Sequence, residues 1–265
     1  MLPRFRRAIF FVCVLSLALP PWAAWPSGET ESLRYRANLL FHQRSDLNQA
    51  QAAAELYRKI VAKNPNDEEA ALRLARLLIW LGMHDKGEKE LKLYHEAVEV
   101  ARKAVQAHPN RPGPHYWLGL AYGLLADAEM ALKSLVYVKG LRKEMELLLE
   151  RDPGYYYGGA YRVLGRLYTK LPRVLGGDRV KAEEYLRRAV ELGPSYLLNH
   201  LFLAGLLQDQ GRTKEAALII AQVRQAIPQP GLEPECRFWK GLAEKYSRQH
   251  LPKKPVRGPA VDSSH

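Results

Sequence analysis

The residues of this sequence best suited to bind a ligand are cations and tyrosines near the middle of the chain. Arg162, Arg166 and Lys170 recur at a four-residue step, which places them along one face of a helix as a cationic stripe. The tyrosines at 155–157 come directly before this stripe. Arginine and aromatic side chains together favour carboxylates, anionic peptides or an acidic partner helix. The alternative is a solvated basic face above tyrosines that belong to the core.

Motifs typical of catalysis or metal binding do not accompany these residues. The eight histidines form neither an HExxH motif nor another pair at one-turn spacing, and no GxSxG motif is present. The glycine pairs at 158–159 and 176–177 lack the GKS or GKT of a phosphate loop and are interpreted as turn residues. His115 and His200 are interpreted as packing residues, with a ligand role as the alternative. We therefore predict a protein that is not an enzyme and that holds no cofactor or metal.

The elements that position these residues are predicted to be helices in a repeated arrangement. No window after the N-terminal segment shows the sustained alternation of a strand. Five prolines each follow a helical stretch, at intervals of 44, 44, 41 and 34 residues: Pro65, Pro109, Pro153, Pro194 and Pro228. The last interval equals the tetratricopeptide period, and the longer ones indicate lengthened helices or elbows. Proline suits the turns between units because it lacks an N–H group and cannot continue a helix.

A repeated LGxxY pattern marks where two helices approach closely. It occurs at 118–122 and again at 164–168. One helical hairpin cannot bury its apolar face alone, so neighbouring hairpins must cover it. We therefore predict an all-α fold, a tetratricopeptide-like right-handed α-solenoid of about five helical hairpins within residues 30–250. A helix over 233–249 is predicted to cap the last repeat.

The concave groove of such a solenoid is lined by one face of each unit's first helix. The leucine, glycine and tyrosine of LGxxY face the neighbouring helix, so the residues that flank them are expected to face the groove. The candidate ligand- or partner-binding residues by this count are Arg76, Trp80, Tyr116, Tyr156, Arg162, Arg166 and Lys170. We predict that the cationic stripe is free to contact a partner, because the residues around it are committed to packing.

The N-terminal segment predicts an exported protein. Residues 1–24 combine a basic start with an apolar run over 8–19, which is shorter than the ~20 residues of a membrane span. This pattern indicates a cleaved signal peptide and a periplasmic or secreted location, with an uncleaved membrane anchor as the alternative. The proline-rich residues 251–265 are predicted to form a disordered tail. The net charge is +12, but the basic residues are interleaved with acidic ones along the predicted helices. This pattern is typical of solvated helix faces and does not favour nucleic-acid binding.

Three stretches of the sequence resemble a known family. They are HYWLGLAYG at 115–123, KSLVYVKGLRKEMELLLERDP at 133–153, and the segment 158–192, which contains the elbow LPRVLGGD at 171–178. Together they resemble the T-component (TatT) family of TRAP transporters, which are periplasmic tetratricopeptide-like helical proteins. They resemble, more distantly, the regulator of microtubule dynamics proteins. The T-component resemblance implies a helical solenoid that can form homo-oligomers and that pairs with the solute-binding protein of a carboxylate transporter.

The residues and the resemblance together predict an exported, non-enzymatic helical-repeat scaffold. Its expected partner is a protein, in the sharper version a periplasmic solute-binding protein, or else a small carboxylate ligand held in the groove. In that sharper version the chain is a T-component-like accessory subunit of a TRAP-type uptake system. Two other functions remain open, namely a general scaffold for cell-envelope assembly and an oligomeric protein that binds a small ligand.

Overall fold

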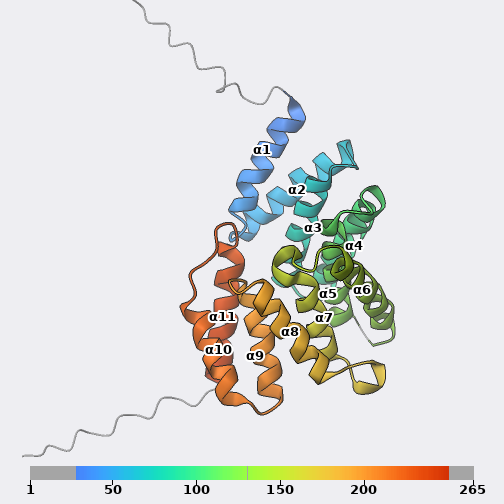
Figure 1. The fold of residues 1–265 in the computed structure, drawn as a ribbon. Helices are drawn as coiled ribbons and strands as arrows, with labels where there is room; N and C mark the ends of the chain where they lie inside the picture. Colours follow the sequence, from blue (N-terminus) through green and yellow to red (C-terminus); the bar gives the residue numbers. More distant parts are fainter. Residues whose placement is uncertain (1–27, 130, 251–265) are drawn as a thin grey trace, which may run out of the picture.

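The computed structural model describes residues 28–129 and 131–250, and all regular structure within these residues is helical (Figure 1). The α-helices are α1 (Glu29–His42), α2 (Leu47–Lys63), α3 (Glu68–Met83), α4 (Glu88–Ala107), α5 (Pro112–Ala128), α6 (Ala131–Arg151), α7 (Tyr155–Lys170), α8 (Arg179–Leu192), α9 (Leu197–Asp209), α10 (Thr213–Gln225) and α11 (Glu233–His250). A short 3₁₀ helix, η2 (Arg173–Leu175), lies between α7 and α8. None of these helices combines the length and the apolar character that crossing a membrane requires. The predicted signal peptide at 1–24 and the predicted tail at 251–265 lie outside the described residues.

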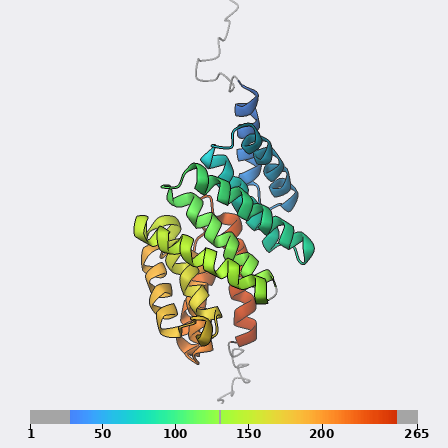
Figure 2. The ribbon, with the colours of Figure 1, turned by 90° about the vertical axis from the view of Figure 1, so that its right-hand side faces the viewer.

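Consecutive helices pair into hairpins, and α11 follows the last of them. The hairpins are α1–α2, α3–α4, α5–α6, α7–α8 and α9–α10, and each also packs against the next. Figure 2 shows the series descending from α1 at the top to α9 and α10 at the bottom. The predicted all-α solenoid of five hairpins with a final helix is confirmed. The longer repeat units contain longer helices, since α4 has 20 residues and α6 has 21, whereas α10 has 13.

Capping side chains and a proline set several helix boundaries. The carboxylate of Asp67 accepts a hydrogen bond from the backbone N–H of Ala70 at the start of α3. Asp178 accepts one from the backbone N–H of Val180 at the start of α8. Both bonds satisfy N–H groups that have no partner inside the helix. Pro112 occupies the first turn of α5, where its missing N–H group is not needed.

Small residues allow α7 and α8 to approach closely. A Cβ atom on Gly165 would lie 2.8 Å from Cγ of Leu186, so a larger residue there would displace α8 or its side chains. Leu164 of α7 and Ala182 and Ala189 of α8 are buried at the same contact. The sequence prediction that these positions are committed to helix packing is confirmed.

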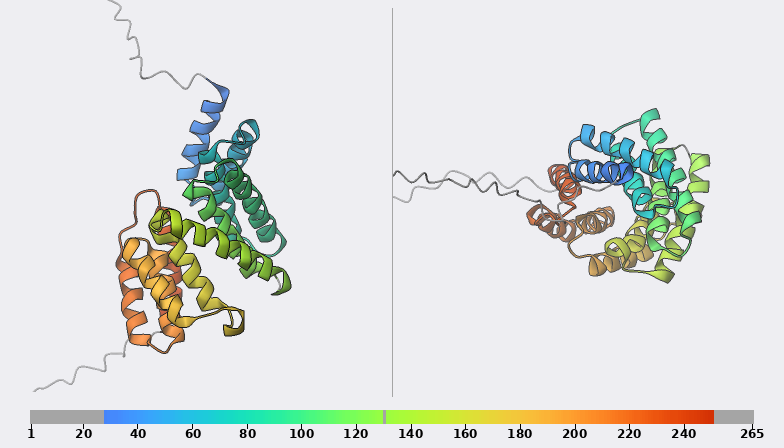
Figure 3. Two further views of the ribbon diagram at one scale, coloured as in Figure 1. Left: turned by 45° about the vertical axis from the view of Figure 1, so that its right-hand side comes forward. Right: turned by 90° about the horizontal axis from the view of Figure 1, so that it is seen from above.

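The solenoid closes on itself through α11. Seen from above, the helices form a ring in which α11 lies between the first hairpin and the last (right panel of Figure 3). One side of α11 packs on α9 and α10. Its Glu235 forms ion pairs with Arg44, in the turn between α1 and α2, and with Arg76 of α3. The helix that the sequence predicts as a cap therefore also joins the last repeat to the first.

Candidate functional site

The inner faces of α3, α5, α7, α9 and α11 surround a cavity of about 220 Å³, which we call the central chamber. Its wall is mostly apolar and rich in aromatic side chains: Trp80, Tyr116, Trp117, Tyr156, Tyr196, Phe202, Phe238 and Trp239. Three charged residues, Arg76, Arg162 and Glu235, also line it. An apolar cavity with a few converging polar groups is typical of a ligand-binding site.

Five of the seven predicted binding residues line the central chamber. They are Arg76, Trp80, Tyr116, Tyr156 and Arg162. They come from three different helices, so the solenoid brings together side chains that lie up to 86 residues apart in the chain (162 minus 76).

Arg166 and Lys170 do not line the chamber. The Arg166 guanidinium lies over the ring of Phe202, with 5.0 Å between its Cζ and the ring centroid. Lys170, at the end of α7, is exposed and lines a separate surface groove. The prediction of one cationic stripe free to contact a partner is therefore wrong, because the stripe runs from the fully buried Arg162 to the exposed Lys170. A helix has 3.6 residues per turn, so a four-residue step drifts around its axis.

Arg162 is a buried cation with no acidic partner in the described part of the chain. It is only 1% exposed. Its Nη2 donates to the hydroxyl of Tyr116 at 2.6 Å, and its Nη1 donates to Oδ1 of Asn199 at 2.9 Å. The guanidinium carbon lies 4.3 Å from the ring centroid of Tyr196. Within the part of the chain that the structure describes, no carboxylate bonds to Arg162, so its charge is balanced by dipoles and an aromatic face alone.

A left-handed turn at the start of α7 directs two carbonyl groups at Arg162. Tyr156, Tyr157 and Gly158 have φ values of 48°, 61° and 70°. Left-handed backbone costs a tyrosine about 1–3 kcal/mol, so its surroundings must hold it in place. The carbonyl oxygens of Tyr156 and Tyr157 accept hydrogen bonds from Nη1 of Arg162 at 3.3 and 3.4 Å. The Tyr156 ring also stacks on Tyr116, with 4.8 Å between the ring centroids.

Two of the tyrosines around Arg162, Tyr156 and Tyr196, remain neutral. Burial raises the pKa of Tyr196 well above its ordinary value and raises the pKa of Tyr156 as well. Neither ring therefore supplies a negative charge at neutral pH. Burial also lowers the pKa of Arg166, because partial removal from water disfavours its charged form. On the α7 side of the chamber, Arg162 thus contributes a buried positive charge that these two tyrosines do not neutralise.

Arg76 differs from Arg162 because a carboxylate neutralises it. Oε1 of Glu235 accepts from Nη2 of Arg76 at 2.6 Å, and Oε2 accepts from Nη2 of Arg44 at 2.6 Å. Burial by itself would raise the pKa of Glu235, but the charges of Arg76 and Arg44 lower it below its ordinary value. The two arginines therefore share one ionised carboxylate on α11.

The site also contains residues that sequence reasoning did not select. Asn199 and Tyr196 hold Arg162, and Glu235 and Phe238 of α11 complete the chamber. Asn199 could have been found, because a buried amide within the apolar run LLNHLFLAGLL needs hydrogen-bond partners. No comparable signal marks α11, whose place in the chamber follows from the closure of the ring.

A second buried polar pair, His115 and Glu144, lies outside the chamber. Nδ1 of His115 is 2.6 Å from Oε2 of Glu144, and its Nε2 is 2.8 Å from the carbonyl oxygen of Pro109. The pair joins α5 to α6, in keeping with the interpretation of His115 as a packing residue. Among the residues that the structure describes, no group of three or more His, Cys, Asp or Glu side chains could hold a metal ion.

The fold and the chamber define a tetratricopeptide-like helical-repeat scaffold, a class of protein whose concave surfaces bind partners. Residues 35–171 match the family model described as Regulator of microtubule dynamics protein 1-3, and the chain belongs to this family. No curated protein sequence matches the chain.

The assignment to the T-component family of TRAP transporters was wrong. The family that matches is the one to which the sequence bears the more distant resemblance. Tetratricopeptide-like proteins keep their packing residues while their partners diverge, so the LGxxY patterns report how the helices pack and not what they bind. The match also ends at residue 171, where the GGD elbow that supported the assignment begins.

Solved structures of tetratricopeptide proteins resemble this fold. TTC0263, a thermophilic TPR protein of Thermus thermophilus, has 24% sequence identity and a TM-score of 0.60, over 80% of this chain and 99% of its own. MamA from Desulfovibrio magneticus RS-1 has 20% identity and a TM-score of 0.47, over 74% of this chain and 94% of its own. At 24% identity the likeness to TTC0263 concerns the fold alone.

Proposed function

We propose that this protein is a non-enzymatic helical-repeat scaffold whose central chamber binds a small apolar carboxylate. The observation that carries the proposal is the charge of Arg162, which is buried in the chamber wall without an acidic partner among the described residues. Burying an uncompensated charge is costly, and a ligand carboxylate beside Arg162 would offset that cost. The aromatic wall supplies apolar surface for the rest of the ligand.

The size of the chamber limits the ligand. Its volume of about 220 Å³ is below the roughly 300–1,000 Å³ of pockets that hold drug-sized molecules. A short aliphatic or aromatic acid therefore fits better than a peptide helix. Arg76 does not compete for the carboxylate, because Glu235 already neutralises it.

A protein partner is the second candidate, and the fold favours it. Stacked helical hairpins present extended surfaces on which other proteins dock. Because α11 contributes to the chamber wall and closes the ring, a partner would bind on the outer surface or displace α11.

We also propose that the protein acts in the periplasm or after secretion, on the basis of the signal-like pattern in residues 1–24. Mass spectrometry of the protein recovered from the cell envelope tests this. A chain that begins at a residue close to 25 would support cleavage, and an intact Met1 would contradict it.

Isothermal titration calorimetry with hexanoate and phenylacetate tests the chamber, with the corresponding neutral amides as comparison ligands. The acids are expected to bind and the amides are not, because only an acid balances the charge of Arg162. Arg162→Met should abolish binding, and Leu120→Trp should do the same by filling the chamber that Leu120 lines. Lys170→Met, which removes an exposed cation outside the chamber, should leave binding unchanged.

Circular dichroism establishes that each variant is folded. The proposal fails if acid and amide bind equally well, if neither acid binds, or if a folded Arg162→Met variant binds the acids as the unaltered protein does.

A further inference from the structure

The elbow between α7 and α8 exposes aliphatic side chains at the edge of the solenoid. It contains η2 and projects from the body of the molecule (yellow, lower right in Figure 1). Val174 is 91% exposed, Leu175 is 47% exposed, and Val180, in the first turn of α8, is 81% exposed. The loop is ordered by backbone hydrogen bonds, such as the one from the N–H of Gly177 to the carbonyl oxygen of Pro172 at 3.0 Å. These hydrogen bonds thus fix the loop in a conformation that exposes the three aliphatic side chains to water.

Cations surround these aliphatic side chains. Lys170, Arg173 and Arg179 line one surface groove together with Val180. Among the described residues, Lys170 and Arg173 form no ion pair with a carboxylate, and Arg179 donates to a main-chain carbonyl group of α9. The acid within the elbow, Asp178, uses its carboxylate to cap α8.

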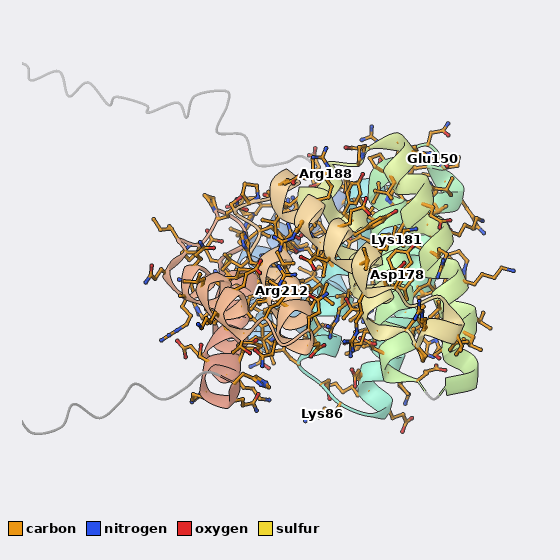
Figure 4. The ribbon with its side chains drawn as sticks, turned by 60° about the horizontal axis from the view of Figure 1, so that its bottom comes forward. Lys86, Glu150, Asp178, Lys181, Arg188 and Arg212 are labelled. Atoms are coloured by element: carbon orange, nitrogen blue, oxygen red, sulfur yellow. The ribbon has the colours of Figure 1, made fainter. Side chains whose placement is uncertain are left out.

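The neighbouring helix α6 adds further positive charge. The Arg142 guanidinium reaches the elbow, where it lies 3.3 Å from the position that a Cβ atom on Gly176 would occupy. Arg142 and Lys181 both lie over the ring of Tyr168, at 5.6 and 4.7 Å from its centroid. Figure 4 shows Lys181 and Asp178 on this side of the molecule, next to α6. We call the surface that carries these cations the basic elbow surface. Its cations are Arg142, Lys170, Arg173, Arg179 and Lys181.

The adjoining surface is built differently, because its cations are paired with acids. Arg187 of α8 and Arg212, just before α10, share the carboxylates of Glu183 and Glu215 at distances of 2.5–2.8 Å. Among the described residues, no acid of α6 forms such an ion pair with the cations of the basic elbow surface, although Glu146 lies one helical turn from Arg142 and lines a groove with it. Within residues 28–129 and 131–250, the cations of the basic elbow surface therefore form no ion pair, and its aliphatic side chains stay exposed.

We propose that the basic elbow surface binds bilayers that contain anionic phospholipids. Lysine and arginine side chains are attracted by the negative surface potential of such a bilayer. Val174, Leu175 and Val180 can enter the boundary between headgroups and acyl chains, where apolar side chains leave water. An acidic protein would also balance the cations, but the place of the aliphatic side chains at the most exposed part of a projecting loop favours insertion into a bilayer.

Co-sedimentation of the full chain with vesicles tests this proposal. Vesicles of phosphatidylcholine with phosphatidylglycerol are compared with vesicles of phosphatidylcholine alone, at low and at high salt. Lys170→Glu combined with Arg173→Glu should weaken binding to the anionic vesicles roughly tenfold or more, because each surface cation contributes to the attraction. Val174→Ser combined with Leu175→Ser should also weaken binding, while the dependence on salt remains.

The matched control is Lys89→Glu combined with Lys92→Glu on α4, which makes the same change in net charge at two exposed lysines outside the basic elbow surface. This variant should bind as the unaltered protein does. The apolar N-terminal segment is common to all variants, so differences among them report the elbow. All the substituted side chains are exposed or partly exposed, and circular dichroism checks that the fold is kept.

Two results would overturn the proposal. The first is an equal loss of vesicle binding in the control variant and in the Lys170→Glu, Arg173→Glu variant. That result would show that the net charge of the protein alone accounts for the effect. The second is unchanged vesicle binding by the Val174→Ser, Leu175→Ser variant together with tight binding of polyglutamate by the unaltered protein. That result would indicate an acidic protein partner and no lipid surface.

Discussion

Replacing Glu235 with glutamine removes the carboxylate that closes the ring. The change keeps the size of the side chain but leaves the charges of Arg44, which is 0% exposed, and of Arg76 without a negative partner. Removing one partner of a buried ion pair costs about 3–5 kcal/mol. Arg44 also donates to the carbonyl oxygens of Phe41 and Gly231, and these bonds remain in the variant. We therefore expect a loss at the lower end of the range, about 3 kcal/mol in the free energy of unfolding.

Urea unfolding followed by circular dichroism measures this loss. The matched control is Glu233→Gln, which makes the same chemical change at an exposed position in the first turn of α11 and should leave the free energy of unfolding essentially unchanged. Hydrogen exchange of the α11 amides shows whether this helix detaches before the other helices unfold. A loss below about 1 kcal/mol, the value of an exposed salt bridge, would refute the reasoning.

The carboxylate of Glu235 should also make the free energy of unfolding depend on pH. Burial alone would raise the pKa of Glu235, but Arg76 and Arg44 lower it below the ordinary 4.5. A group with a lower pKa in the folded state stabilises the fold above its unfolded pKa, and this contribution is lost as the pH falls through the folded value. The unaltered protein should therefore lose stability below about pH 4.5, and the Glu235→Gln variant should lose less over the same range. Parallel slopes in urea titrations at several pH values would contradict this.

Two further predictions concern packing and alkaline pH. Gly165→Ala should destabilise the fold by about 1–3 kcal/mol, because the new Cβ meets Leu186, whereas Gly205→Ala, with no atom within 4 Å of its Cβ, should stabilise α9 by about 0.5–1 kcal/mol. Thermal melts measure both changes, and a loss of stability in both variants would contradict the packing argument. Burial raises the pKa of Tyr57 from the ordinary 10.0 to about 12, so the stability it contributes is complete below pH 10 and is lost as the pH rises toward 12. Tyr57→Phe should flatten this alkaline fall in the free energy of unfolding, and an equally steep fall would count against the prediction.

Local chemistry made the helical hairpins predictable. Pro65, Pro109 and Pro194 lie in the turns between hairpins, because a fixed φ and a missing N–H group end a helix whatever surrounds them. The LGxxY spacing correctly placed Tyr116 on the inner face of the solenoid, since side-chain direction in a helix follows from position in the sequence. Rules of this kind involve only residues within a few turns of one another.

Contacts between distant parts of the chain could not be predicted in this way. Arg162 is bonded to Tyr116, 46 residues before it, and to Asn199, 37 residues after it. Glu235 and Arg44 are 191 residues apart. The sequence around Arg162 is the same whether the side chain is exposed or buried, because its burial is decided by helices that arrive from elsewhere in the chain. The expectation of an exposed stripe was wrong for this reason.

The ion pair between α11 and the first hairpin limits how the number of hairpins in this protein can change during evolution. An open solenoid can gain or lose a hairpin by duplication or deletion, because each unit contacts only its neighbours. In a closed ring, the addition or the loss of one hairpin would change the position of α11 relative to the first hairpin. Glu235 would then no longer lie beside Arg44. Descendants of this chain can therefore lengthen an elbow or a helix, but they keep the number of hairpins unless they also give up the buried arginine.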